Sequence, residues 1–147
     1  MSRKIKFRMW DKDYKEMRIF GKNQHDDFRT NRNNELYYYN LQDGETSSEC
    51  GAYELMQYTG IKDVTGKEIY EGDIVEFYND VDYVLHPGIA KVIFDLGTFQ
   101  MENEKYGTDY LGNMDIDDMD IRVIGNIYEN QEWLKSEVEQ WVKKNGY

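Results

Sequence analysis

The sequence predicts a mainly β protein with some α structure (α+β), in which short antiparallel strands form a barrel-like core. Short runs rich in β-branched and aromatic residues alternate with glycines and Asp or Asn turns, a pattern typical of small barrels and sandwiches. Aromatic residues make up 15% of the 147 residues, which supplies enough large apolar surface for a core. Helical spacing is found only near the C-terminus.

The N-terminal segment predicts a β-hairpin. Apolar and basic residues alternate over Ile5–Trp10, the period of a half-buried strand. A turn at Asp11–Asp13 leads into a return strand over Glu16–Phe20. The polar segment Gly21–Asn34 shows no periodicity, so a mobile loop or insertion is predicted there.

Glu35–Leu41 is expected to form a strand because it carries three consecutive tyrosines, which suit a pleated surface. Tyr38 then faces away from Tyr37 and Tyr39. One face of this strand enters the core and the other offers a rim to a partner, so Tyr38 is a candidate interface residue.

The central region predicts strands joined by tight turns. Leu55–Gly60 forms a strand, and Asp63–Gly66 forms a turn in which the glycine supplies a positive φ. A second turn at Glu71–Asp73 begins the strand Ile74–Tyr78.

A loop is predicted over Asn79–Gly88, which holds the only proline. A hairpin follows, with strands Ile89–Phe94 and Thr98–Met101. After an acidic stretch, Ile121–Tyr128 is expected to be the closing strand. Gly125 there allows a bulge or a close backbone approach.

Residues 130–145 predict an amphipathic helix with Asn130 as N-cap. Its apolar stripe consists of Trp133, Leu134, Val138, Trp141 and Val142. The interpretation favoured by ordinary amphipathicity is that this stripe packs on the protein's own sheet. The alternative is that Trp133 and Trp141 face another subunit, since aromatic residues are enriched in interface cores.

The length favours one domain over residues 1–147. Residues 1–52 would hold the hairpin and variable loops, residues 53–128 the β core, and residues 130–145 the helix.

The formal net charge is −11, from 29 acidic and 18 basic side chains. Nonspecific nucleic-acid binding depends on Lys and Arg neutralising phosphates, so this charge disfavours direct nucleic-acid binding. Apolar runs are far shorter than the ~20 residues that cross a bilayer, and no signal-peptide pattern is found. With a single cysteine, Cys50, no internal disulfide can form, and we expect a cytoplasmic protein without membrane contact.

Three blocks of the sequence resemble the YopX family of phage and prophage proteins. The opening Ile5–Asp11 is similar to the family's start, Leu55–Asp63 and Gly66–Val75 to its central signature, and Val123–Asn130 to its closing motif. Their order and spacing agree along nearly the whole chain. The family often has a proline after the closing motif, whereas Gln131 stands here, a departure that touches helix initiation.

The resemblance implies a cytoplasmic prophage or bacteriophage protein that forms a homo-oligomer. It brings no catalytic residue, because the family has no established activity. Asp63, Gly66, Gly72 and Asp73 are therefore interpreted as turn residues.

No catalytic residue and no cofactor are assigned, since no phosphate loop, dinucleotide fingerprint or nucleophile elbow is present. Two histidines and one cysteine cannot make a conventional zinc site. The acidic patch candidates are Asp115, Asp117, Asp118 and Asp120. They lack the glycine and glutamate positions of an EF-hand, so a solvated face is favoured over a metal site.

Three functions follow, in order of preference. The first is a non-catalytic accessory protein that self-associates and binds another macromolecule, such as a host or phage protein. The second is an acidic, DNA-mimic-like inhibitor that occupies the positively charged groove of a nucleic-acid-binding host protein. The third is a metal-dependent hydrolase that uses the acidic cluster.

Overall fold

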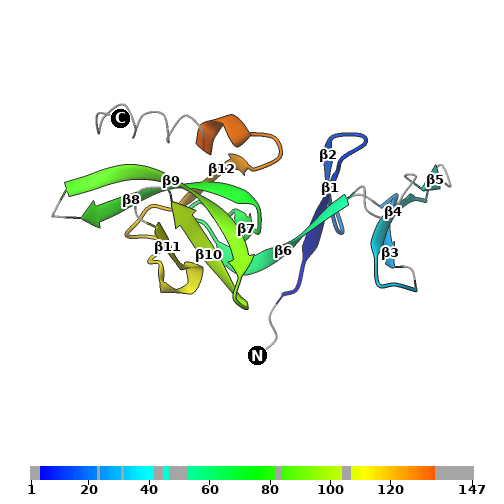
Figure 1. Cartoon of the computed structure of the whole chain (residues 1–147), viewed down its shortest axis with the longest axis horizontal. Coiled ribbons are helices and arrows are strands. Elements are labelled where there is room, and N and C mark those ends of the chain that lie inside the picture. The colour runs from blue at the N-terminus through cyan, green and yellow to red at the C-terminus, as the bar shows by residue number, and fades with distance from the viewer. Residues whose placement is uncertain are drawn as a thin grey trace. The chain divides into compact units, whose positions relative to one another are not determined.

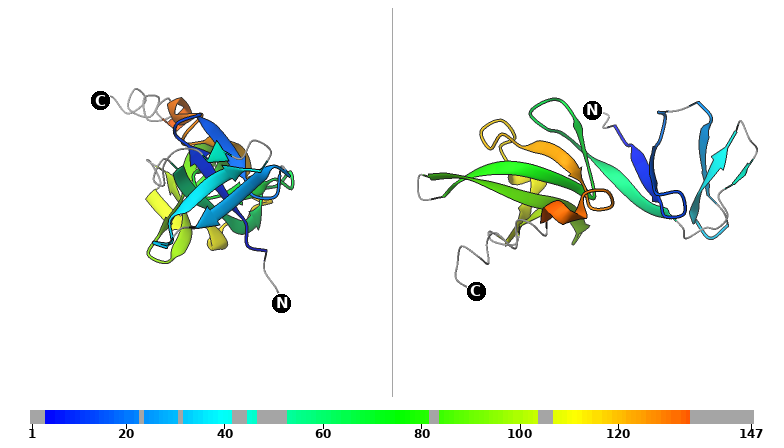
Figure 2. Two further views of the ribbon diagram at one scale, coloured as in Figure 1. Left: turned by 90° about the vertical axis from the view of Figure 1, so that its right-hand side faces the viewer. Right: turned by 90° about the horizontal axis from the view of Figure 1, so that it is seen from above.

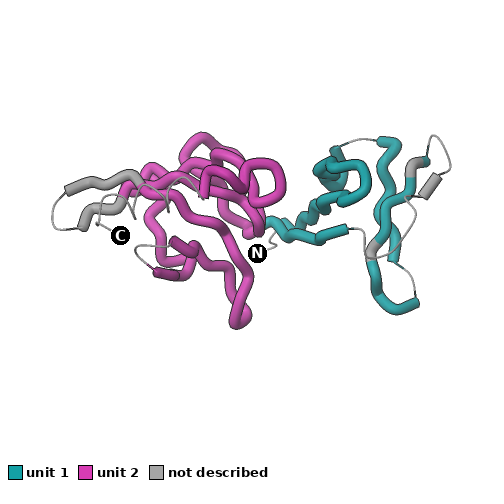
Figure 3. The backbone as a smooth tube through the Cα atoms, turned by 45° about the horizontal axis from the view of Figure 1, so that its top comes forward, with its two compact units in different colours: residues 1–58 teal, residues 59–147 magenta. Residues whose placement is uncertain are grey.

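The computed structural model describes residues 4–22, 24–30, 32–41, 45–46, 53–81, 84–103 and 107–134. The chain is mainly β and gathers into two compact units, Met1–Tyr58 and Thr59–Tyr147 (Figure 3). The prediction of one domain over residues 1–147 stays a prediction, and each unit is described by itself.

Unit 1 contains the expected N-terminal hairpin. Strand β1 (Phe7–Asp11) pairs antiparallel with β2 (Glu16–Ile19) and, on its other edge, with the first half of β6 (Tyr53–Lys62). The hairpin turn is fixed by Asp11, whose buried Oδ1 accepts hydrogen bonds from the N–H groups of Asp13 and Tyr14. A short polar side chain bonded to the backbone two residues on is the usual chemistry of such a turn.

A second sheet of unit 1 corrects one prediction. Strand β3 (Asp26–Thr30) lies within the segment predicted as a loop, and it pairs with β4 (Leu36–Asn40), which pairs in turn with β5 (Glu45–Thr46). Phe28 lies opposite Tyr38, and its ring stacks on Phe20 with centroids 3.7 Å apart. One aromatic contact and a neighbouring strand thus order a segment whose own sequence is polar.

Unit 2 is built on a five-stranded antiparallel sheet in the order β11-β10-β9-β8-β12. The sheet curls into half of a barrel (Figures 1 and 2). The strands are β8 (Asp73–Val81), β9 (Val84–Asp95), β10 (Thr98–Asn103), β11 (Gly107–Tyr110) and β12 (Arg122–Asn126). The last half of β6 pairs with the short strand β7 (Glu68–Tyr70) beside this sheet.

Two features of this sheet differ from the prediction. Residues predicted as a loop around Pro87 instead continue β8 and β9, with Tyr78 paired to Pro87 and Asn79 to His86. A proline is tolerated there because the pairing of β9 with β10 runs only from Asp95 to Lys91, so that Pro87 has a described neighbouring strand on one side only. Strand β11 was missed because all four of its residues are exposed, so no alternation marks it.

The core of unit 2 lies against the inner face of the curled sheet. Its fully buried members include Ile69, Val75, Ala90, Val92 and Ile121. Buried residues alternate along β9 at Gly88, Ala90 and Val92, as an antiparallel sheet with one solvated face requires. The predicted hairpin of β9 and β10 is confirmed, with Asp95 paired to Thr98 across its turn.

The described part of the chain contains little helix. One 3-10 turn, η1 (Leu111–Asn113), follows β11, and residues 131–134 form one helical turn. The rest of the helix predicted for residues 130–145 lies outside the described residues. No helix in the described part is long and apolar enough to cross a membrane.

Candidate functional site

A cavity of about 320 Å³ opens on the inner face of the curled sheet in unit 2. Four consecutive strands of the sheet, β8 to β11, each contribute to its wall, together with η1 and the segment that follows it. Its apolar lining consists of Phe77, Ala90, Met101, Met114 and Met119. Its polar lining consists of Asn103, Gly107, Thr108, Asp109 and Asn113.

The aromatic wall of the cavity depends on a glycine across the strand pair. Phe77 in β8 lies opposite Gly88 in β9, and a Cβ at position 88 would come within 2.6 Å of the ring. Glycine therefore lets the Phe77 ring lie directly against the β9 backbone. Phe77 is 4% exposed, so the ring is fixed by packing on the sheet.

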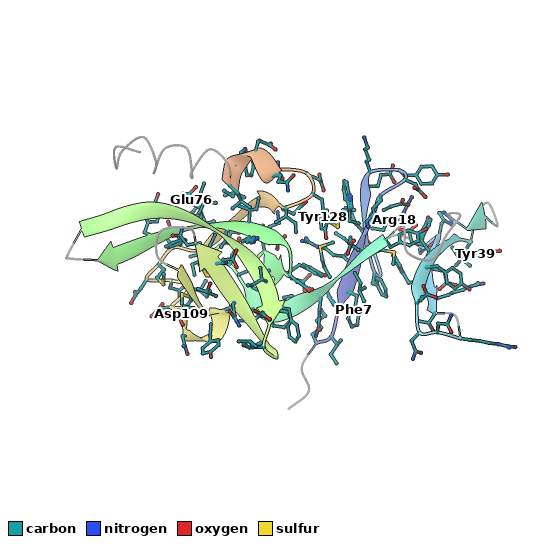
Figure 4. The ribbon with its side chains drawn as sticks, viewed as in Figure 1. Phe7, Arg18, Tyr39, Glu76, Asp109 and Tyr128 are labelled. Atoms are coloured by element: carbon teal, nitrogen blue, oxygen red, sulfur yellow. The ribbon has the colours of Figure 1, made fainter. Side chains whose placement is uncertain are left out.

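The polar end of the cavity is organised around a carboxylate. Asp109 comes from the edge strand β11 (labelled in Figure 4). Its Oδ1 accepts hydrogen bonds from the Tyr110 N–H at 2.7 Å and from Asn113 Nδ2 at 3.4 Å. Asn103 stands deeper and is buried, with its Nδ2 donating to the Ile89 carbonyl at 2.8 Å. The carboxylate is thus held in place at an exposed rim.

The turn between β9 and β10 presents an apolar tip. Leu96 is 88% exposed and Phe94 is 53% exposed. Phe94 contacts Phe99 across the hairpin with ring centroids 5.1 Å apart. Leu96 and Gly97 both have positive φ, 52° and 78°, which is the backbone of a two-residue hairpin turn. Asn or Gly suits the first of these positions much better than leucine does.

The acidic patch candidates lie in the turns between η1 and β12. Asp115, Asp117 and Asp118 are exposed, whereas Asp120 pairs with Arg122 at 3.0 Å. The Oδ1 of Asp115 accepts the Asp118 N–H at 3.0 Å, so this carboxylate also stabilises its own turn. Within the described residues, no group of three or more carboxylate, histidine or cysteine side chains could hold a metal ion.

The aromatic interface candidates have different surroundings. Trp133 is half-buried, and the edge of its ring lies so close to Gly125 that a Cβ there would be 2.7 Å from Trp133 Cζ3. Gly125 also sits at a register shift between β12 and β8, so it serves both roles predicted for it. The contact places at least part of the Trp133 ring on the protein's own sheet. Trp141 lies outside the described residues.

Tyr38 belongs to a polar cluster inside unit 1. Its ring lies 3.9 Å from the guanidinium carbon of Arg18, and its hydroxyl donates to Asp26 Oδ1 at 2.6 Å. Arg18 Nε donates in turn to the fully buried Asp11 at 3.1 Å. Burial, together with the Asp11 charge, raises the pKa of the neighbouring Tyr53 to about 12. At 5% exposure, Tyr38 offers little surface to a partner.

The carboxylate of Asp63, in the central sequence block, holds the turn that follows it and links this turn to β12. The Asp63 side chain is 5% exposed. Its Oδ1 accepts hydrogen bonds from the Thr65 N–H, the Thr65 hydroxyl and the Lys67 N–H. Its Oδ2 accepts the Val123 N–H of β12 at 2.9 Å, across 60 residues of sequence. Burial would raise the pKa of this carboxyl, but the Thr65 hydroxyl and the backbone N–H groups of Val123, Lys67 and Thr65 hold it below its ordinary value.

The second turn of the block works in the same way. Asp73 is 2% exposed, and its Oδ2 accepts the Tyr70 N–H at 2.7 Å. Gly72 lies between them at φ +87°, a conformation that glycine adopts without strain. The turn interpretation of Asp63, Gly72 and Asp73 therefore agrees with the contacts they make.

Sequence reasoning missed the cavity because each part of its wall comes from a different strand, and residue spacing does not show how consecutive strands curl around a common space. One signal was present. The acidic stretch is interrupted by Met114, Ile116 and Met119, which pack against the core of unit 2. Apolar residues that recur inside a charged run indicate that one side of the run is covered.

The fold and the cavity define a mainly β protein of two compact units, with a ligand-sized cavity in the curled sheet of the second. The family model described as "YopX protein" matches residues 6–135, and the chain belongs to the YopX family.

The chain is similar to several solved structures, among them the following two. Protein yopX from Bacillus subtilis is 24% identical with a TM-score of 0.64, and the match covers 86% of this chain and 95% of that one. Protein EF1440 from Enterococcus faecalis is 26% identical with a TM-score of 0.56, covering 90% and 99%. No curated protein matches the sequence. These comparisons give the fold and the family, and they name no activity.

Proposed function

We propose that the protein is a non-catalytic accessory protein of a phage or prophage, which acts in the cytoplasm by self-association and by binding another macromolecule. The observation that carries this proposal is the apolar tip of the β9–β10 hairpin, formed by Phe94 and Leu96. The two side chains are 53% and 88% exposed, so the tip offers apolar surface that burial against a partner would stabilise.

The backbone at the tip strengthens the argument. A leucine in the left-handed region costs roughly 1 kcal/mol relative to a right-handed conformation. Because Leu96 is 88% exposed, burial of its side chain within its own protein offsets almost none of this conformational free energy. Folding alone therefore gives no reason for leucine at this position, whereas insertion into an apolar surface of another protein molecule does.

The test compares the solution mass of the wild-type protein with that of Leu96→Asn by sedimentation velocity over a range of concentrations. Asparagine keeps the positive φ of the turn and removes the apolar side chain. We expect the wild type to form an oligomer and the variant to dissociate at concentrations where the wild type stays assembled. The matched control is Tyr14→Asn, which removes another large apolar residue, 62% exposed, from the turn of a different hairpin.

A monomeric wild type at every concentration would refute self-association. Equal masses for the wild type and Leu96→Asn would refute the role of the tip and return attention to the second candidate surface, Trp133 and Trp141. Trp141→Glu tests that surface directly, because a buried charge in an interface core dissociates it.

The acidic decoy is a second candidate, supported by the exposure of Asp115, Asp117 and Asp118. Within the described residues these three make no ion pair, whereas Asp120 makes one. Neutralising all four aspartates to asparagine should abolish capture of a nucleic-acid-binding host protein from nuclease-treated lysate. Capture that survives the substitutions would reject this version.

A further inference from the structure

The cavity of unit 2 has the size and lining of a small-molecule site. Such sites span roughly 300–1,000 Å³, and this one, at about 320 Å³, lies at the lower end. A few convergent polar groups on an apolar wall are the usual arrangement. Here Asp109 and Asn113 stand at one end, and Phe77, Met101 and Met119 form the wall.

The charge at the rim selects the kind of ligand. Asp109 is held by the Tyr110 N–H and by Asn113, both through Oδ1. None of the described residues that line the cavity is Lys, Arg or His. The whole chain carries a formal charge of −11, so the surrounding field also repels anions. A fixed carboxylate, with no cation among the described lining residues, favours a ligand that brings its own positive charge.

The wall suits the same kind of ligand. Methionine sulfurs are polarizable, and methionine side chains adapt to irregular apolar shapes. Three of the ten described lining residues are methionines. We propose that this cavity binds a small organic cation, an amine or quaternary ammonium compound with an apolar body. The ammonium group faces Asp109 and the body lies against Met114 and Met119, the two half-buried methionines of the lining. This inference is independent of self-association through the hairpin tip.

The experiment uses the full chain with 13C-methyl-labelled methionine and follows the methyl signals of Met101, Met114 and Met119 by NMR. The probes are phenethylamine, its neutral analogue phenethyl alcohol, the anion phenylacetate and the quaternary benzyltrimethylammonium ion. We expect both cations to cause saturable shifts of these three signals. The alcohol should bind about tenfold more weakly or worse, because it lacks the charge-assisted contact. Phenylacetate should cause no shift.

The matched pair of variants is Asp109→Asn and Asp95→Asn. Each removes one exposed carboxylate whose Oδ1 accepts the N–H of the next residue, at 2.7 Å and 3.0 Å respectively. Only Asp109 lines the cavity. Asp109→Asn should weaken the cations about tenfold and remove their advantage over the alcohol. Asp95→Asn should leave binding unchanged.

Three outcomes would overturn the proposal. The first is the absence of saturable methyl shifts with either cation at millimolar concentration. The second is equal binding of phenethylamine and phenethyl alcohol by the wild type. The third is an equal loss of binding in the two variants, which would indicate attraction by the general acidity of the chain. If Asp109→Asn fails to fold, the wild type decides, because phenethylamine must bind more tightly than phenethyl alcohol and shift the signals of the three lining methionines, whereas attraction by general acidity would not single out these three signals.

Discussion

Replacing Asp63 by asparagine turns one buried carboxylate into an amide and leaves the shape of the side chain almost unchanged. The carboxylate accepts four hydrogen bonds, three through Oδ1 and one through Oδ2. In asparagine the carbonyl oxygen can keep the three bonds to Thr65 and Lys67. The amide nitrogen then occupies the place of Oδ2 and points a donor at the Val123 N–H, so the link to β12 is lost.

The expected cost follows from that single contact. Losing a hydrogen bond to a charged group costs about 1.5–3 kcal/mol. The amide N–H₂ of the new asparagine would face the N–H of the half-buried Val123, which then lacks its acceptor. We therefore expect Asp63→Asn to lower the free energy of unfolding by about 2–3 kcal/mol. Asp95→Asn, the same change at an exposed turn carboxylate, should cost less than about 1 kcal/mol.

Urea unfolding followed by circular dichroism measures the free energies, and amide hydrogen exchange locates the effect. The Val123 amide should lose protection in Asp63→Asn, while the amides of β10, at the far side of the sheet, keep theirs. The reasoning is wrong if Asp63→Asn unfolds within about 0.5 kcal/mol of the wild type, or if Val123 exchanges no faster than before.

The remaining predictions concern stability in acid and substitutions at three glycines. The pKa of Asp63 is lowered in the folded state, so its stabilisation is present above the unfolded value of about 3.9 and is lost as the pH falls through the folded value. The stability gap between wild type and Asp63→Asn should narrow in acid, and a pH series of urea midpoints checks this. Gly125→Ala should destabilise by roughly 1–3 kcal/mol through overlap with Trp133 and Asn130, whereas Gly112→Ala, where a Cβ meets open space, should be nearly neutral in thermal unfolding. Gly88→Ala should displace the Phe77 ring, visible as shifted ring signals in NMR.

Local chemistry made the hairpins predictable. The turns at residues 63–66, 71–73 and 95–97 combine an Asp side chain with a glycine at positive φ, and each feature acts within a few residues. The same reasoning predicted a bulge or close approach at Gly125, and both are present.

Strands without a pattern of their own were not predictable. Strand β3 depends on Phe28 meeting Tyr38 and Phe20, and β11 has no buried residue at all. Beyond Tyr78, β8 and β9 continue because each pairs with the other, although Pro87 and polar residues argue locally for a loop. In each case, pairing with a neighbouring strand fixes the backbone of a segment whose own sequence does not mark it as a strand.

The sequence by itself determined the mainly β class, the family and the positions of the tight turns, because these depend on residues close together in the chain. Tertiary structure alone decided that Phe77, Met101, Asp109 and Met119 surround one cavity, and that Asp63 reaches Val123. The cavity residues stand on different strands, β8, β10 and β11, and on the segment before β12, and the curl of the sheet brings their side chains together. Neither periodicity nor turn chemistry carries information at that separation.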